Sequence, residues 1–211
     1  MNNRIKRVIV FAGDSTTDAG KRNSTDGLGH GYVALVQNAL KAFRPWEDVK
    51  VINAGVSGNT SRDLVTRYDA DITACQPDIV FCMIGINDVW RRIDMSADEK
   101  DLVYEKEYTE NLEKICKMTC GKSKLLLMTP FFMERNLHDE MRMLSDKYCA
   151  IVKSVGAKHS VPVIDVQAAF DEYMQYRPGI TVSWDRVHPE TIGAHIIARK
   201  VMEALNECFN A

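Results

Sequence analysis

Residues 7–20 read RVIVFAGDSTTDAG, and this stretch decides the fold. Its first part, Arg7–Phe11, carries a run of apolar residues without polar alternation, which is typical of a strand covered on both faces. Parallel strands of α/β proteins normally have this environment. The small and polar residues of Gly13–Gly20 follow directly, and such residues are typical of a turn that leads from a strand into a helix. The segment therefore predicts the first β-α unit of a parallel sheet.

The same alternation continues through the rest of the chain. Four further apolar runs are short enough to be strands: Val49–Ile52, Asp78–Ile84, Lys124–Met128 and Val161–Val166. Segments with helical periodicity lie between them: Tyr32–Phe43, Leu64–Cys75, Tyr104–Cys120, Asp139–Gly156, Gln167–Met174 and Thr191–Phe209. We therefore expect an α/β fold with one doubly wound parallel sheet and right-handed crossovers. No internal boundary is visible, so residues 1–211 are predicted to form a single domain.

The most polar segment is Arg91–Asp101, which reads RRIDMSADEKD. We predict a surface loop here. It is either a solvated connection or a border of the active site, and the sequence leaves both open.

The composition is that of an ordinary globular protein. The chain has 211 residues, of which 45% are hydrophobic and 27% charged, and these values exclude collagen-like, mucin-like and disordered chains. Lys and Arg number 27 against 29 Asp and Glu, with no basic block that could follow a phosphate backbone. Nucleic acid is therefore not an expected partner.

Several features favour a cytoplasmic protein. The N-terminal apolar run, Val8–Ala12, is shorter than the roughly 7–15 residues of a signal-peptide core. The other apolar runs fall below the roughly 20 residues that a membrane span needs, so no membrane association is expected. The six cysteines are expected to be free thiols in a reducing compartment.

Ligands of an open parallel sheet bind beyond the carboxyl ends of the strands, so the residues after each apolar run are the candidates for chemistry. Ser15 follows the first strand and could present its hydroxyl at the sheet edge, which makes it the candidate nucleophile. The alternative is that Ser15 only caps a helix.

Asp185 and His188 are separated by two residues, and Pro189 keeps His188 out of helical geometry. A turn brings such positions within about 7 Å, so the Asp185 carboxylate can accept a hydrogen bond from one ring nitrogen and leave the other as a base. A helix-capping aspartate beside a surface histidine is the alternative.

An oxyanion also needs donors. The Asn87 side-chain amide, a backbone N–H at Gly58 and the backbone N–H of Ser15 are the candidates, because glycine lets the backbone approach a substrate closely. Alternatively, Gly58 relieves a tight turn and Asn87 ends a strand.

Metal and nucleotide sites are not predicted. The other histidines lack the spacing of zinc ligands, and the glycines of DGLGHGY (residues 26–32) match neither phosphate-binding pattern. We expect no cofactor and no metal.

Together, these residues resemble the four blocks of the GDSL-type serine hydrolases, the SGNH hydrolase superfamily. GDSTTDAG (13–20) is similar to the first block, VSGNT (56–60) to the second, GIND (85–88) to the third and DRVH (185–188) to the fourth. The resemblance implies a Ser15, His188 and Asp185 triad, with Ser15, Gly58 and Asn87 forming the oxyanion hole.

The longer strings GHGYVALV (29–36), GVSGNTSRDL (55–64) and WDRVHPETIGAH (184–195) look most like intracellular GDSL-type acetyl-xylan esterases. This resemblance implies a flavodoxin-like, three-layer α/β/α fold with a five-stranded parallel sheet, and a homo-oligomer without a metal. It also implies a small acetylated carbohydrate as substrate, with xylo-oligosaccharides the expected class.

Trp90, Trp184 and Arg91 lie beside the motifs and are candidates for the wall of the substrate site, since an indole face packs well on a sugar ring. The two tryptophans could instead be packing residues and Arg91 a solvated charge. Two other functions stay open: a lysophospholipase or thioesterase on the same scaffold, and a non-catalytic carbohydrate-binding relative.

Overall fold

The computed structural model describes residues 6–94 and 98–210. Five parallel strands form one sheet in the order β2-β1-β3-β4-β5. Their bounds are Lys6–Gly13 for β1, Asp48–Gly55 for β2, Ile79–Met83 for β3, Lys124–Met128 for β4 and Val163–Ile164 for β5. This is the flavodoxin-like order of doubly wound sheets. The predicted α/β fold class is confirmed.

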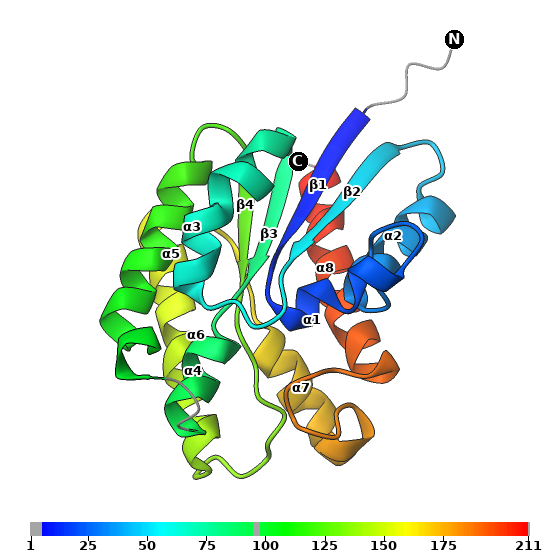
Figure 1. The fold of residues 1–211 in the computed structure, drawn as a ribbon. Coiled ribbons are helices and arrows are strands. Elements are labelled where there is room, and N and C mark those ends of the chain that lie inside the picture. The colour runs from blue at the N-terminus through cyan, green and yellow to red at the C-terminus, as the bar shows by residue number, and fades with distance from the viewer. Residues whose placement is uncertain (1–5, 95–97, 211) are drawn as a thin grey trace.

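The helices cover both faces of the sheet (Figure 1). Their bounds are Ser15–Asp18 for α1, Tyr32–Phe43 for α2, Ser61–Asp71 for α3, Ile86–Ile93 for α4, Glu105–Thr119 for α5, Glu140–His159 for α6, Val166–Met174 for α7 and Thr191–Asn210 for α8. Helices α2, α7 and α8 pack on one face, and α3, α4, α5 and α6 pack on the other. The arrangement is therefore a three-layer α/β/α sandwich.

Each strand supplies side chains to two separate cores. In β1, Ile9 and Phe11 belong to the core under α2, α7 and α8, whereas Val10 and Ala12 belong to the core under α3 to α6. All four are fully buried. Because successive side chains of a strand point to opposite faces, a strand buried on both faces must be apolar throughout. This explains the unbroken apolar run that opens the chain.

Side chains at the loop ends start several of the helices. In α3, the Thr60 hydroxyl and the Asp63 carboxylate form a reciprocal capping box. Asp139 begins α6 by accepting a hydrogen bond from the backbone N–H of Arg142, at 3.0 Å. Such caps fix where a loop ends, and so they fix the length of the loops that carry the site.

The bounds of several expected elements differ from the structure, and the differences at α4 and β5 have clear physical reasons. Arg91 and Arg92 are part of α4, which extends to Ile93, so the predicted loop begins only after that residue. Residues 95–97 of that prediction lie outside the described residues. The sequence did not predict α4 because its few apolar residues form only a narrow stripe along the helix, with polar and charged residues between them. The last strand, β5, is shorter than expected because only Val163 and Ile164 pair with β4.

The carboxyl ends of three neighbouring strands meet at one place. Gly13, the last residue of β1, is in register with Gly55 at the end of β2 and with Met83 at the end of β3. A Cβ at Gly13 would lie 2.3 Å from the Thr17 hydroxyl oxygen and 2.5 Å from the Met83 carbonyl oxygen. Only glycine fits, and the loops after β1, β2 and β3 are thereby brought side by side.

Candidate active site

The first helix presents Ser15 at the end of β1. The Asp14 carboxylate, rather than the Ser15 hydroxyl, caps α1 by accepting a hydrogen bond from the backbone N–H of Thr16 at 3.0 Å. The Ser15 side chain is therefore available for another partner. Its Oγ lies 2.9 Å from Nε2 of His188, although the two residues are 173 positions apart in the sequence. The capping alternative for Ser15 does not describe its contact here.

His188 is held from its other side by Asp185. Nδ1 of His188 lies 2.6 Å from Oδ2 of Asp185. The other carboxylate oxygen, Oδ1, accepts hydrogen bonds from the backbone N–H groups of Val187 and His188, at 2.9 and 2.8 Å, and from the Ser183 hydroxyl at 2.9 Å. Partial burial alone would raise the pKa of Asp185, but these donors outweigh it and lower the pKa to about 2. Asp185 is therefore an ionised hydrogen-bond acceptor at neutral pH.

The loop that carries Asp185 and His188 is fastened to the segment after β4. Arg186 has a φ of 67°, a left-handed conformation that is uncommon for a residue with a side chain. Its carbonyl oxygen accepts a hydrogen bond from the N–H of Met133 at 2.8 Å, and its guanidinium group lies 2.7 Å from the Glu134 carboxylate. The same group lies over the Phe132 ring, 4.7 Å from the centroid. These contacts compensate for the backbone strain at Arg186 and fix the loop.

The two predicted oxyanion donors lie beyond the carboxyl ends of β2 and β3, with Gly58 in the loop after β2 and Asn87 in the first turn of α4. Gly58 has a φ of 80°, which favours glycine. One N–H of the Asn87 side-chain amide donates to the carbonyl oxygen of Asn59 at 2.9 Å. An asparagine amide has two N–H donors, so this bond fixes the group and leaves a second donor. The geometry thus suits donation to a ligand, and the oxyanion role of both residues stays a prediction.

Two buried aspartates are sequence neighbours of the predicted site residues: Asp14 precedes Ser15, and Asp88 follows Asn87. Burial raises the pKa of Asp14 to about 6, against the hydrogen bond from Thr16. Burial likewise raises the pKa of Asp88 to about 7, although Asp88 accepts hydrogen bonds from the backbone N–H and the hydroxyl of Ser61. Charged groups without water are costly, and perturbed carboxylates of this kind cluster at functional sites.

The three candidates for the wall of the substrate site have different surroundings in the structure. The Trp90 ring lies beside the His188 ring, with centroids 5.9 Å apart. Trp184 is 71% exposed and immediately precedes Asp185. Arg91 donates to the carbonyl oxygen of Gly58 at 2.5 Å, so it contacts the predicted oxyanion loop directly. Contact of these three side chains with a substrate remains a prediction.

Sequence reasoning missed Arg67 and Asn59, which the structure places next to the predicted donors. The Arg67 guanidinium reaches the carbonyl oxygens of Gly13 and Ala54 and the side chain of Asn59. One signal was present in the sequence. Arg67 lies at helical spacing between the buried residues Leu64 and Tyr68, and a charged residue so close to an apolar stripe needs a specific partner.

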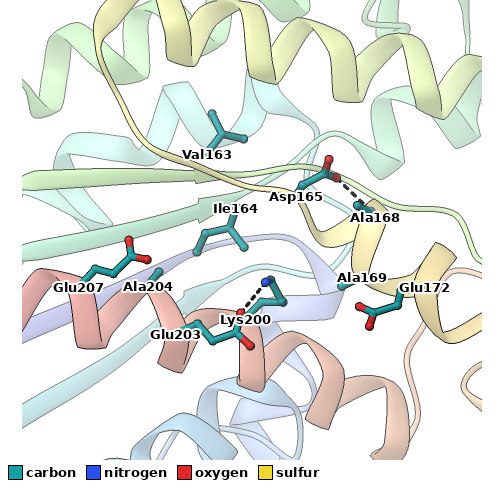
Figure 2. A pocket seen from close by; sticks show the side chains of 10 residues that line it. All are labelled: Val163, Ile164, Asp165, Ala168, Ala169, Glu172, Lys200, Glu203, Ala204 and Glu207. Carbon is teal, nitrogen blue, oxygen red and sulfur yellow. Dashed lines mark hydrogen bonds and ion pairs between the residues drawn. The ribbon is translucent and has the colours of Figure 1, made fainter.

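A cavity of about 320 Å³ lies beside the edge strand β5, between β5, α7 and α8 (Figure 2). None of the predicted site residues lines it. Two of its polar contacts are local: Lys200 pairs with Glu203, and Asp165 accepts a hydrogen bond from the N–H of Ala168 at the start of α7. This cavity therefore does not compete with the Ser15 region as a candidate active site.

The described part of the chain offers neither a cluster of metal ligands nor a membrane-spanning helix. Within residues 6–94 and 98–210, no group of three or more His, Cys, Asp or Glu side chains could hold a metal ion. None of the helices described has both the length and the apolar character needed to span a membrane.

Comparison with known proteins gives consistent matches over nearly the whole chain. Residues 11–196 match the GDSL-like Lipase/Acylhydrolase family. The chain is 40% identical over 203 residues to the acetylxylan esterase of Geobacillus stearothermophilus, covering 93% of each chain.

Two solved structures show the same fold. The crystal structure of LAE5, an alpha/beta hydrolase enzyme from the metagenome of Lake Arreo in Spain, has a TM-score of 0.91 at 37% identity and covers 97% of each chain. The crystal structure of Axe2, an acetylxylan esterase from Geobacillus stearothermophilus, has a TM-score of 0.90 at 39% identity and covers 96% of this chain and 95% of that one. Further Axe2 structures are of catalytic mutants in which a serine, a histidine or an aspartate is replaced by alanine.

Proposed function

Because the chain belongs to the GDSL-like lipase/acylhydrolase family, we propose that it removes acetyl groups from acetylated xylo-oligosaccharides through an acyl-enzyme formed on Ser15. The chain is a carboxylic ester hydrolase. The observation that carries the proposed mechanism is the continuous hydrogen-bonded chain from Ser15 Oγ through His188 to Asp185. Four separate segments supply it and the neighbouring donors: those that follow β1, β2 and β3, and the loop before α8.

The proposed reaction begins with proton transfer. His188 Nε2, at 2.9 Å, accepts the Ser15 hydroxyl proton while Oγ attacks the acetyl carbonyl carbon. The resulting imidazolium gives this proton to the sugar oxygen as the ester bond breaks, which leaves Ser15 acetylated. Water then enters, His188 accepts a proton from it, and the attack releases acetate and restores the Ser15 hydroxyl. Asp185 holds the ring and stabilises its charged form without taking the proton.

The two tetrahedral intermediates carry a negative charge on the former carbonyl oxygen. The backbone N–H groups of Ser15 and Gly58 and the second N–H of the Asn87 amide are the proposed donors to this oxygen. Such donors act through preorganisation, and removal of one typically costs about 2.7–4 kcal/mol of barrier. The bond from Asn87 to the Asn59 carbonyl supports this role because it fixes the amide before the substrate arrives.

The proposed substrate rests on relatives and on the walls of the site. The acetylxylan esterase of Geobacillus stearothermophilus shares 40% identity over 93% of the chain, and two Axe2 mutant structures are described as those of an acetyl-xylooligosaccharide esterase. Trp90 lies against His188, and Trp184 is exposed beside Asp185. The exposed Trp184 indole is therefore available to pack against a sugar ring, whereas Trp90 packs partly against the core and would meet the substrate at its edge beside His188.

The test is acetate release from acetylated xylo-oligosaccharides, run beside p-nitrophenyl esters from acetate to octanoate. Each substrate is given to the unmodified enzyme and to Ser15→Ala. We expect rapid deacetylation of the oligosaccharides, rates that fall with acyl length, and a loss of at least roughly 10⁴-fold in kcat in the variant. Rates that rise with acyl length and untouched oligosaccharides would refute the substrate and favour a lipolytic enzyme. Retained turnover in Ser15→Ala would refute the mechanism.

The proposal extends to the whole protein, as a single domain over residues 1–211 that acts as a cytoplasmic homo-oligomer. All five strands join one sheet, and all six cysteines are free thiols, as expected for a reducing compartment. Large apolar side chains away from the candidate active site are exposed and would be covered by subunit contacts: Phe43, Trp46, Tyr176 and Ile180. Light scattering of the purified protein checks this, and a mass equal to one chain at micromolar concentration would refute the oligomer.

A further inference from the structure

We propose that Arg67 is a positioning residue that aligns the oxyanion loop with the strand that carries the nucleophile. The inference rests on the proposed function, because it assigns Asn87 and the loop of Gly58 to the oxyanion. Arg67 lies in α3 and contacts no reacting atom in this arrangement. Its effect on the reaction would pass through Asn59 and Asn87.

The Arg67 guanidinium joins three segments that end at the site. Nη2 donates to the carbonyl oxygen of Gly13 at 2.9 Å, two residues before Ser15. Nη1 donates to the carbonyl oxygen of Ala54 at 2.8 Å, near the end of β2. Nε donates to Oδ1 of Asn59 at 2.6 Å, in the loop that follows Gly58. One rigid, planar group thus sets the distances between the end of β1, the end of β2 and the oxyanion loop.

Asn59 passes this constraint on to the oxyanion donor. Its side chain is held by Arg67, and its carbonyl oxygen accepts the hydrogen bond from the Asn87 amide at 2.9 Å. Its backbone N–H donates to the carbonyl oxygen of Val56 at 3.1 Å, which closes the turn around Gly58. A displacement of Asn59 would therefore rotate or release the Asn87 amide. Oxyanion donors are effective only when they are held in place before the charge develops.

Burial and charge make Arg67 suited to this task. Its side chain is only 16% exposed, so the hydrogen bonds face little competition from water. Asp71, one turn further along α3, lies 3.0 Å from Nη1 and supplies the opposite charge. A lysine at this position would keep the charge but lose the planar fork, and it could not reach all the acceptors at once.

The test is a double-mutant cycle on the kcat for p-nitrophenyl acetate. Arg67→Lys is expected to lower kcat by roughly 10- to 100-fold with KM little changed, since a misplaced donor affects the transition state. Asn87→Ala removes the proposed donor itself. In the Asn87→Ala background, Arg67→Lys is then expected to cost less than about threefold, because the group that Arg67 positions is already absent. Independent, multiplying losses, or a kcat for Arg67→Lys equal to that of the unmodified enzyme, would overturn the proposal.

The matched control is Arg62→Lys in the same helix. The Arg62 guanidinium also binds a carboxylate and backbone carbonyls, namely Glu107 and the carbonyl oxygens of Lys100 and Leu102, but none of the proposed oxyanion residues. We expect its kcat to stay within about twofold of the unmodified enzyme, whatever its thermal midpoint. A purely structural role for Arg67 would give both variants lowered thermal midpoints and an unchanged kcat.

A second variant covers the case in which Arg67→Lys does not fold. Asn59→Ala removes the side chain that Arg67 holds and keeps the bonds of Arg67 to Gly13 and Ala54. It is expected to lower kcat and to show the same lack of additivity with Asn87→Ala.

The proposed function and the proposed role of Arg67 would be refuted by different results. Turnover that survives in Ser15→Ala refutes the proposed function, whereas additive losses in an enzyme that depends on Ser15 refute only the role of Arg67.

Discussion

Asp185 shows how hydrogen bonds decide the state of one side chain. Its carboxylate receives four hydrogen bonds, from His188, Val187 and Ser183, and they lower its pKa to about 2 despite partial burial. A group with a pKa this low keeps its charge across the whole range in which esterases work. Asp185 therefore acts on His188 through orientation and charge, and it does not exchange protons during turnover.

Replacement of Asp185 by asparagine tests this role. Asp185→Asn keeps the shape but places an N–H₂ or a neutral oxygen opposite Nδ1 of His188, which favours the wrong ring tautomer. We expect kcat to fall by roughly 10³- to 10⁴-fold with a smaller change in KM. Ser183→Ala is the matched control, because it removes one donor to Asp185 and leaves the bond to His188. An Asp185→Asn enzyme within tenfold of the unmodified kcat would contradict the assignment.

Asp88 carries a different kind of prediction, on stability. Its pKa is raised to about 7 by burial, helped by the nearby charge of Asp14. A raised native pKa contributes stability that is present below the unfolded pKa near 4 and is lost as the pH rises through about 7. Asp88→Asn removes this titration. The free energy of unfolding of this variant, taken relative to that of the unmodified protein, should therefore be higher at pH 8.5 than at pH 5 by about 1–3 kcal/mol.

Urea unfolding at the two pH values measures this difference. Asparagine keeps one oxygen to accept from Ser61, and any loss of hydrogen bonding is similar at both pH values, so it cancels in the comparison. Asp185 does not interfere, because its lowered pKa affects stability only as the pH falls from about 4 towards 2. An equal effect of Asp88→Asn at both pH values, or a larger benefit at pH 5, would contradict the raised pKa.

Among the elements, the turn between β1 and α1 has no room for a further side chain. A Cβ at Gly13 would overlap Thr17 and the Met83 carbonyl oxygen. Gly13→Ala would therefore force β1 away from β3 or displace α1, and it should cost about 1–3 kcal/mol of stability and lower kcat. Gly27→Ala is the control: Gly27 has a left-handed φ of 71°, which alanine tolerates poorly, but nothing lies within 4 Å of the added methyl group, so kcat should be unchanged. Thermal unfolding and esterase assays compare the two, and equal kcat values would contradict the packing argument.

Most strands and helices could be predicted because their apolar residues keep the spacing of one kind of element from end to end. The strand β1 is apolar throughout, and the helix Tyr32–Phe43 was expected with the bounds that the structure shows. Helix α4 was not expected, since RRI reads as the start of a polar loop unless the stripe from Ile86 to Ile93 is noticed. The strand β5 was predicted too long because an apolar run does not say how many residues find a partner strand.

For the site, the sequence indicated residues at strand ends and in an Asp-x-x-His turn, and the structure brings Ser15, His188 and Asp185 together. It could mark Arg67 as a charged residue beside an apolar stripe, but it could not identify the partners of that residue. That side chain reaches acceptors at the ends of β1 and β2, 54 and 13 residues away, and such contacts depend on how the helix packs rather than on local spacing. The raised pKa of Asp88 was likewise hidden, since burial is a property of the folded chain.

At the scale of the whole molecule, the candidate site combines segments from near the two ends of the chain. Ser15 follows the first strand, whereas Asp185 and His188 precede the last helix, so the nucleophile and its base meet only when α8 packs against α2 and the sheet. Arg186 fastens the same loop to the segment after β4. The order of strands, with β1 between β2 and β3, then places the oxyanion loops on both sides of Ser15.

The most direct test of the central claim is covalent labelling with a p-nitrophenyl phosphate triester, followed by peptide mass spectrometry. A serine nucleophile held by His188 attacks the phosphorus and keeps the phosphoryl group, because the stable adduct resists hydrolysis. We predict one phosphoryl group per chain, on Ser15, with esterase activity lost in proportion to the labelling. A label on another residue, full labelling with retained activity, or no label in an enzyme that still hydrolyses p-nitrophenyl acetate would contradict the account.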